Sequence, residues 1–239
     1  IFRICFIDPF QGAVLAKFAY TTLKARRVAL LTSVNSPYSV GLSGVLKERF
    51  TALGGTIVAE QKHAEGDKDF RAQLTAIRAA KPDVIAATGF YSEAALICKQ
   101  ARALGLDIPI IGGDGWEAPQ LAELGGKAVE NTYYCTYFSA DNNAPEVQAF
   151  VQRYKARWNG ESPEGVSALG YDAMFLIADA MKRTNSPGGP KLRDAIASTK
   201  DFTGITGKTA FDSQRNSEKT AVMITTKDGR PTFFEAVVP

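Results

Sequence analysis

Apolar and polar positions follow two alternating patterns along the first half of the chain. Short apolar runs have the composition of strands buried on both faces, and between them apolar residues recur at the spacing of a helix face. The predicted strands cover residues 26–33, 56–64, 82–89, 107–113 and 128–138, and the predicted helices cover 8–26, 40–55, 68–81, 92–105 and 118–126. This alternation predicts an α/β fold with a doubly wound parallel sheet at roughly residues 8–136.

The second half of the chain has a different pattern. Three helical patterns follow one another over residues 139–160, 166–185 and 188–202, with no strand between them. The tail indicates short strands, and "AVMITTKDGRPTFFEAV" predicts a hairpin that turns at Asp228 and Gly229. In this prediction the three helices have no sheet of their own, so their apolar faces must pack on the first module or on a missing partner.

Composition and charge limit the classes of function. Of the 239 residues, 45% are hydrophobic and 22% are charged, and the formal net charge is +3, as in an ordinary globular protein. No basic run or basic stripe with interleaved aromatic residues appears, so no nucleic-acid partner is expected. No apolar segment approaches the length of a membrane span.

The start of the chain and its cysteines give weaker information. The opening "IFRICFI" begins at Ile1 and has the pattern of a strand already under way. A processed mature product and a fragment both fit this start, and the lack of a start signal favours a cut inside a longer chain. None of the three cysteines has metal-binding spacing. Cys98 lies on the apolar side of a helical pattern, which predicts a buried thiol.

The candidate chemistry follows the carboxyl ends of the predicted strands, where open parallel sheets bind their ligands. The aromatic and acidic side chains at this edge are Tyr38, Phe90, Tyr91, Asp114 and Trp116. A carboxylate ringed by aromatic side chains indicates a pocket for a small molecule with an ammonium group. In the competing interpretation, Asp114 is only a helix cap or turn former. Its coincidence with the aromatic residues favours the pocket.

A phosphate site and an enzyme fit this sequence less well. The loop "GGDGW" matches neither the dinucleotide motif nor the P-loop, and a carboxylate there would repel phosphate. His63 is the only histidine and lies in a polar stretch, so a solvated surface position is expected rather than a catalytic one. No nucleophile elbow or metalloprotease motif appears. We therefore expect no catalytic residue, no metal and no cofactor.

The segments "IFRICFIDPFQGAVLAKFAY", "YSVGLSGVLKERFTALGG", "PIIGGDGW" and "SALGYDAMFLIADAM" together resemble the periplasmic branched-chain amino-acid-binding proteins. These are Leu/Ile/Val-type solute receptors of ABC importers with the class I periplasmic binding fold. The resemblance implies a two-lobed clamp around a free amino acid, a periplasmic location and a membrane permease as partner. It also implies that the N-terminal part of lobe 1, which helps to hold the ligand carboxylate, is missing from this chain.

The resemblance assigns roles to single residues. Tyr38 stands where a tyrosine covers the ligand, and Phe90 or Tyr91 stands where an aromatic side chain contacts it. Asp114 stands where an acid binds the α-ammonium group, and its neighbour Trp116 would shape the pocket wall.

The same resemblance divides the chain into segments. It implies a hinge strand at 1–7, the complete ligand-binding lobe 2 at 8–136, helices of an incomplete lobe 1 at 137–204, and strands at 205–239 that return to the hinge and lobe 2. Tyr171 stands where an aromatic residue of lobe 1 closes on the ligand, and core packing is an equally good interpretation. Cys5 and Cys135 would lie on crossing hinge strands, which raises a disulfide between them as a hypothesis.

Three functions follow as alternatives. The first is the solute-binding component of an amino-acid importer, for an aliphatic or branched-chain amino acid. The second is an amino-acid-sensing ectodomain of the same fold. The third is a truncated fragment that binds little by itself and self-associates or swaps domains through exposed apolar helix faces.

Overall fold

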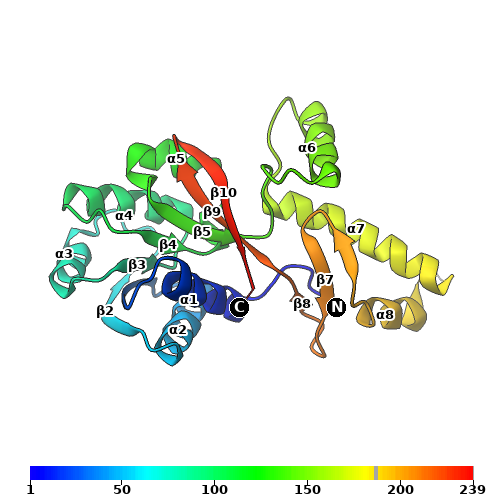
Figure 1. Ribbon diagram of the computed structural model, residues 1–239, viewed down its shortest axis with the longest axis horizontal. Coiled ribbons are helices and arrows are strands. Elements are labelled where there is room, and N and C mark those ends of the chain that lie inside the picture. The colour runs from blue at the N-terminus through cyan, green and yellow to red at the C-terminus, as the bar shows by residue number, and fades with distance from the viewer. Residues whose placement is uncertain (186–187, 239) are drawn as a thin grey trace. The chain divides into compact units, whose positions relative to one another are not determined.

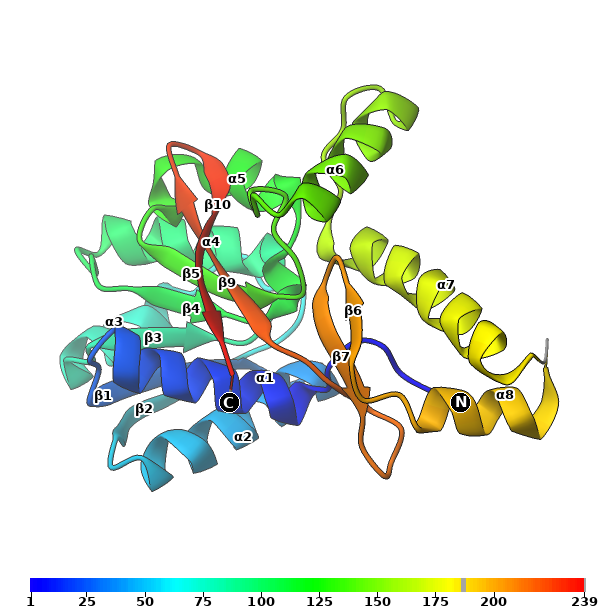
Figure 2. The same cartoon turned by 45° about the vertical axis from the view of Figure 1, so that its right-hand side comes forward.

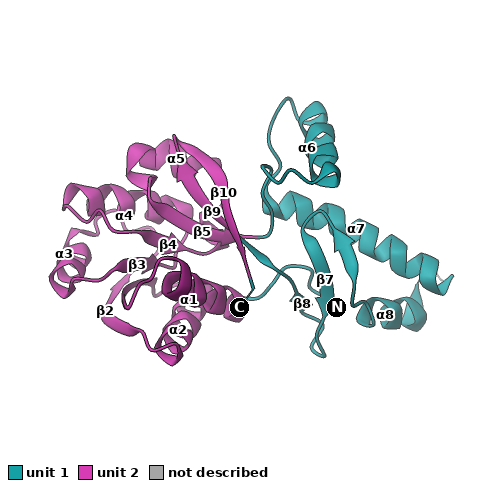
Figure 3. Cartoon of the chain, viewed as in Figure 1, with its two compact units in different colours: residues 1–7, 137–222, 238 teal, residues 8–136, 223–237, 239 magenta. Residues whose placement is uncertain are grey.

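The computed structural model describes residues 1–185 and 188–238 of the chain. These residues form two compact units (Figures 1 and 3). Unit 1 contains residues 1–7, 137–222 and 238, and unit 2 contains residues 8–136 and 223–237. Residues 186–187, within the predicted segment 137–204, and Pro239, at the end of the predicted segment 205–239, lie outside the described residues.

Unit 2 is built on a seven-stranded sheet with the strand order β10-β9-β5-β4-β3-β1-β2. Its strands are β1 (Arg27–Ser33), β2 (Thr56–His63), β3 (Val84–Ala87), β4 (Ile110–Gly112), β5 (Thr132–Thr136), β9 (Ala221–Lys227) and β10 (Arg230–Val237). Strands β1 to β5 pair in parallel. Every residue of β3 and β4 is buried, as the continuous apolar runs in the sequence predict.

The helices of unit 2 cover both faces of this sheet. They are α1 (Asp8–Lys17), which closes in a π-helical turn at Phe18–Thr22, α2 (Pro37–Ala52), α3 (Arg71–Ala80), α4 (Tyr91–Ala103) and α5 (Pro119–Gly125). The path from β1 to β2 runs in the opposite direction across the sheet to the path from β2 through β3 and β4 to β5. Right-handed crossovers therefore place α2, with α1 beside it, on one face and α3, α4 and α5 on the other, as Figures 1 and 2 show.

Unit 1 contains three helices and a small antiparallel sheet among its described residues. The helices are α6 (Pro145–Arg157), α7 (Gly165–Thr184) and α8 (Gly189–Ala197), and the strands are β6 (Phe202–Gly204), β7 (Gly207–Phe211) and β8 (Ser217–Glu218). Helix α7 contacts β6, so the expectation that these helices lack a sheet of their own is wrong. The short strands predicted in the tail include β7 and β8, whereas β6 was missed because it begins at Phe202, the last residue of a predicted helix.

Residues 1–7 differ from the prediction of a strand. They form only an isolated parallel bridge between Arg3 and Asn216. The adjacent strand β8 has two residues, so little backbone is available for a ladder. Phe6 is nevertheless buried, and its ring lies 4.1 Å from that of Tyr137.

A buried polar cluster joins α7 to the small sheet. The Asp172 carboxylate, on α7, accepts the backbone N–H groups of Ile205 at 2.9 Å and Thr206 at 2.8 Å. The Lys219 ammonium donates to the hydroxyls of Thr206 and Thr209. Because all these side chains lie in the interior of unit 1, the cluster fixes the β6–β7 turn against α7.

The predicted fold class is confirmed by this architecture and by the solved structures compared below. The predicted hairpin at 221–237 forms β9 and β10 and completes the sheet of unit 2. None of the helices in the described part of the chain combines the length and apolar character needed to cross a membrane.

Candidate functional site

The candidate site of unit 2 lies where the direction of strand progression reverses. The order 2-1-3-4-5 places this switch point between β1 and β3, and doubly wound sheets bind ligands outside the carboxyl ends of such strands. Tyr38 follows β1, Phe90 follows β3, and Asp114 follows β4. The structure brings Tyr38 and Phe90 together with a ring separation of 5.5 Å, and the Asp114 carboxylate lies close enough for its charge to act on the Tyr38 hydroxyl.

Tyr38 lies in the first turn of α2 rather than in a loop. The Ser36 hydroxyl caps this helix by accepting the backbone N–H of Ser39, and Pro37 occupies the first helical position. The sequence reading began this helix three residues later, at residue 40, because the apolar periodicity starts only there. The capping pattern "SPYS" is the signal that gives the true start.

Buried hydroxyl groups tie the start of α2 to the ends of β1 and β3. The Ser39 hydroxyl accepts the backbone N–H of Ser33 at 2.9 Å and lies 2.8 Å from the Thr88 hydroxyl. Ser43 bonds to the same Thr88 hydroxyl at 2.7 Å. This network holds the first turn of α2, which carries Tyr38, against the end of β3, which leads to Phe90. The positions of the two rings are therefore fixed relative to each other.

The loop after β4 passes through a narrow space. A side-chain carbon on Gly113 would lie 2.8 Å from both Gln11 Oε1 and Leu42 Cδ2, and closer still to the Tyr38 hydroxyl. One on Gly115 would lie 3.0 Å from the Phe90 ring. The two glycines therefore allow the backbone on both sides of Asp114 to approach these side chains, and they do not form a phosphate cradle.

Two side chains from different helices hold the backbone of this loop. Gln11, on α1, accepts the N–H of Asp114 at 3.0 Å, and the Tyr38 hydroxyl accepts the N–H of Gly115 at 3.2 Å. The sequence reading missed Gln11, because a glutamine on the apolar face of a predicted helix is the only signal that it gives.

Burial and nearby carboxylates keep the tyrosine and the cysteine of this site in their neutral forms. Burial, followed by the charge of Asp114, raises the pKa of the Tyr38 phenol above its usual range. The same two causes, in the same order, raise the pKa of the Cys135 thiol well above its usual value. Tyr38 and Cys135 therefore stay protonated at neutral pH, and the Cys135 thiol donates a hydrogen bond to Gln11.

The other predicted site residues take different positions. Phe90 precedes the first residue of α4, and its ring is tilted against that of Tyr38. Tyr91 is the first residue of α4 and is half-buried. Trp116 is fully buried, and it packs so closely on Gly112 that no side chain fits there. It therefore supports the Asp114 loop from the interior of unit 2.

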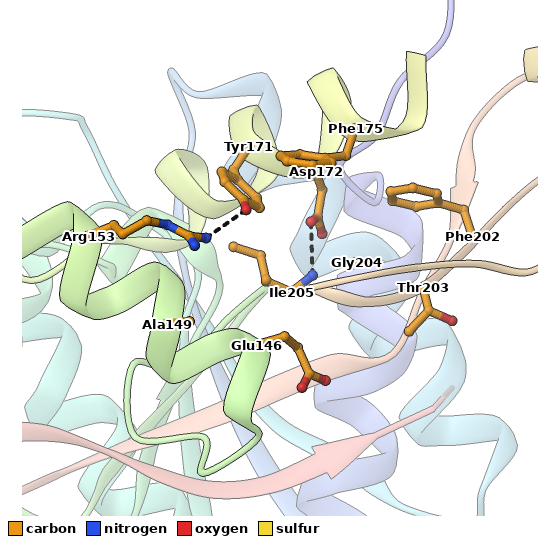
Figure 4. A pocket seen from close by; sticks show the side chains of 10 residues that line it. All are labelled: Glu146, Ala149, Arg153, Tyr171, Asp172, Phe175, Phe202, Thr203, Gly204 and Ile205. Atoms are coloured by element: carbon orange, nitrogen blue, oxygen red, sulfur yellow. Dashed lines mark hydrogen bonds between the residues drawn. The ribbon is translucent and has the colours of Figure 1, made fainter. Parts of the chain in front are cut away.

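Tyr171 belongs to unit 1 and lies in an aromatic cluster there. Its ring is 4.8 Å from Phe150 and 4.6 Å from Phe175, and its hydroxyl accepts a hydrogen bond from Arg153 at 2.9 Å. Figure 4 shows Tyr171, Phe175 and Arg153 at a pocket of about 310 Å³ between α6, α7 and β6. These contacts directly support the interpretation that Tyr171 packs within unit 1.

Two further expectations are corrected by the structure. It contains no disulfide between Cys5 and Cys135: the Cys135 thiol is buried and donates to Gln11 Oε1 at 3.3 Å. His63 is only 4% exposed rather than solvated, because its ring packs edge-on against Phe70 at the end of β2. Cys98 is a buried thiol, as its position in the helical pattern predicts.

The groups needed for a metal centre are not gathered in the described part of the chain. No cluster of three or more histidine, cysteine, aspartate or glutamate side chains there could hold a metal ion.

Comparison with known proteins decides the family. The family model described as periplasmic binding protein matches residues 1–230. The chain belongs to the periplasmic binding protein family. Its relatives include the Leu/Ile/Val-binding protein homolog 1 of Brucella suis, which is 28% identical over 89% of this chain and 56% of its own length. The chain therefore spans about half the length of the curated relatives that it matches.

Solved structures of this family match the architecture. The leucine-binding protein LivK of Thermotoga maritima is 40% identical with a TM-score of 0.88, and the match covers all of this chain and 68% of that protein. The branched-chain amino-acid binding protein LivJ of Streptococcus pneumoniae, solved in complex with isoleucine, is 36% identical with a TM-score of 0.84. That match covers 97% of this chain and 66% of LivJ. These relatives are binding proteins, not enzymes.

Proposed function

We propose that this chain is the amino-acid-binding part of a periplasmic solute receptor that serves an ABC importer. The observation that carries the proposal is the Asp114 loop at the switch point of unit 2, where the Asp114 carboxylate lies near the paired rings of Tyr38 and Phe90. Relatives named for leucine, isoleucine and valine binding support an aliphatic ligand.

Asp114 is the proposed partner of the ligand's α-ammonium group. A carboxylate forms a charge-assisted hydrogen bond with an ammonium group, which is stronger than a bond between neutral groups. The neighbouring Tyr38 phenol and Cys135 thiol are neutral, and Asp114 is the charge that acts most strongly on both of them, ahead of Glu117 at Cys135. An ammonium ligand neutralises that charge without requiring a proton to move.

Aromatic side chains are the proposed contacts for the rest of the ligand. The Tyr38 and Phe90 rings present faces that favour a nearby cation and also cover an aliphatic side chain. Tyr91 is a second candidate at the same turn, and Trp116 acts through its support of the loop. The assignment of Tyr171 as a ligand contact rests on the family resemblance alone.

The exposed apolar side chains of unit 1 favour the alternative that this chain is a fragment of a longer receptor. The relatives are longer than this chain, and unit 1 exposes apolar side chains on α7, including Met174 at 67% and Phe175 at 53%. We propose that the part of the relatives that this chain does not match covers this surface in a complete receptor. Ligand contacts supplied by that part would then be lost here, and the affinity of the chain for an amino acid would be correspondingly weak.

Titration calorimetry with leucine, isoleucine and valine tests the proposed function. Asp114→Asn removes the negative charge with little change in shape and should weaken binding at least tenfold, because the desolvated ammonium loses its counter-charge. Asp107→Asn is the matched control, since Asp107 is exposed and precedes the same strand, β4, at its opposite end. Equal affinities of Asp114→Asn and the unaltered chain would refute the role of Asp114.

A further inference from the structure

Gln11 is a buried polar side chain whose contacts converge on the candidate site. It lies in the first turns of α1, is 1% exposed, and reaches the loop after β4. Its Oε1 atom accepts the backbone N–H of Asp114 at 3.0 Å and the thiol of Cys135 at 3.3 Å. One oxygen atom therefore joins α1, β5 and the backbone of the candidate ligand residue.

The orientation of this amide is determined by its neighbours. A backbone N–H can only donate a hydrogen bond, and Cys135 remains a thiol because burial raises its pKa. Both groups that are hydrogen-bonded to this end of the Gln11 side chain are therefore donors, so the atom that bonds to them is the amide oxygen. An isosteric residue without an acceptor would leave the Asp114 N–H without this partner.

The surrounding packing leaves the loop little freedom. There is no room for a side chain on Gly113 between Gln11, Leu42 and Tyr38. The next two backbone N–H groups, those of Asp114 and Gly115, are held by Gln11 and Tyr38 respectively. The carboxylate thus extends from a residue whose backbone is fixed on both sides by helices α1 and α2.

The geometry points to Gln11 as a positioning residue that fixes the backbone of Asp114 and thereby sets the direction in which its carboxylate meets an ammonium ligand. The expected effect of Gln11 on amino-acid affinity rests on the proposed function. The positioning itself does not depend on a ligand and can be measured without one.

The first experiment measures hydrogen exchange of the Asp114 amide by NMR in the 239-residue chain without ligand. Gln11→Met keeps the length and removes the acceptor, and it should speed exchange of the Asp114 amide about tenfold or more. Gln100→Met is the matched control, because Gln100 accepts the backbone N–H of Phe70 at 2.7 Å in the same unit, on α4. Unchanged exchange at Asp114 in Gln11→Met would overturn the inference.

The second experiment measures leucine and isoleucine binding in a double-mutant cycle. Gln11→Met should weaken binding about tenfold, whereas in an Asp114→Asn background it should have little further effect, because Gln11 acts through that carboxylate. Gln100→Met should leave affinity unchanged. Full additivity of Gln11→Met and Asp114→Asn would overturn the inference. If the unaltered chain binds neither amino acid, the proposed function fails for these ligands, and the exchange experiment still decides the role of Gln11.

Discussion

Gly113 and Gly115 show how two small residues determine what Asp114 can do. Each glycine lies against side chains of neighbouring helices or against an aromatic ring. A methyl group has no space at Gly113 and very little at Gly115. The loop can therefore pass close to Tyr38 and Phe90 only because both neighbours of Asp114 lack side chains. If this loop lay farther from the rings of Tyr38 and Phe90, the carboxylate and the rings could not contact the same ligand.

A methyl group at Gly113 should destabilise unit 2. Gly113→Ala should lower the free energy of unfolding by roughly 1–3 kcal/mol, because the added carbon forces Tyr38, Gln11 and Leu42 apart. Gly41→Ala should have the opposite sign, with a gain of roughly 0.5–1 kcal/mol, because Gly41 is an exposed interior position of α2 with open space around it. Urea unfolding followed by circular dichroism measures both, and equal stabilities of the two variants would contradict this account.

At the scale of elements, the contact between α7 and the small sheet of unit 1 depends on buried charge. Lys219 follows β8 and is 6% exposed, and its ammonium group is bonded to two threonine hydroxyls. Burial lowers the pKa of Lys219 to about 8, and the Asp172 carboxylate partly opposes this shift. The protonation of Lys219 is thus linked to the packing of α7 against β7 and β8.

This linkage predicts that alkaline pH stabilises unit 1. Below pH 8 Lys219 is protonated in both the folded and unfolded chain, so its burial cost is fully present. Between the folded pKa of about 8 and the ordinary value of 10.5, the unfolded chain binds more protons, so the free energy of unfolding should rise with pH. The gain should approach roughly 3 kcal/mol.

Two variants isolate this effect from other alkaline titrations. Lys219→Met should abolish the gain between pH 8 and 10.5, whereas Lys208→Met, at an exposed position of β7, should keep it. Urea unfolding at a series of pH values measures the slopes. The same slope in Lys219→Met and in the unaltered chain would show that Lys219 is not the titrating group.

The sequence predicted elements better than it predicted contacts. Periodicity was sufficient for the five parallel strands and the helices between them, since both faces of this sheet are buried. It failed for residues 1–7, whose bridge partner Asn216 is distant in sequence, and for β6, which begins inside a predicted helix, whereas β7 and β8 lie in the tail where short strands were predicted. The grouping of Tyr38, Phe90 and Asp114 followed from the rule for strand ends, whereas the roles of Gln11 and Thr88 depend on side-chain packing that spacing does not encode.

At the scale of the whole molecule, both units expose some large apolar side chains, and among the described residues those on α7 of unit 1 are exposed to a greater degree than any in unit 2. Unit 2 buries both faces of its central strands. Unit 1 exposes Val166, Met174 and Phe175 along α7, at 53% to 69% of their full surface. Exposed apolar side chains on one helix favour association, because pairing removes them from water.

We therefore expect the isolated chain to self-associate through α7. Sedimentation velocity over a range of protein concentrations should show reversible association of the unaltered chain, and Met174→Ser with Phe175→Ser should shift it toward the monomer. Val34→Ser is the control, because Val34 is 47% exposed in unit 2. A purely monomeric chain across the concentration series would contradict the expectation.

The sheet order of unit 2 also has a consequence for the order of events during synthesis. Strand β9, residues 221–227, pairs next to β5, which ends at Thr136, and β10 lies outside β9. On the ribosome, the edge of β5 stays open until more than 80 further residues have been made, because β9 begins only at Ala221. An open strand edge can pair with another chain. The pairing edge of β5 is therefore completed only when the last strands of the chain have been made.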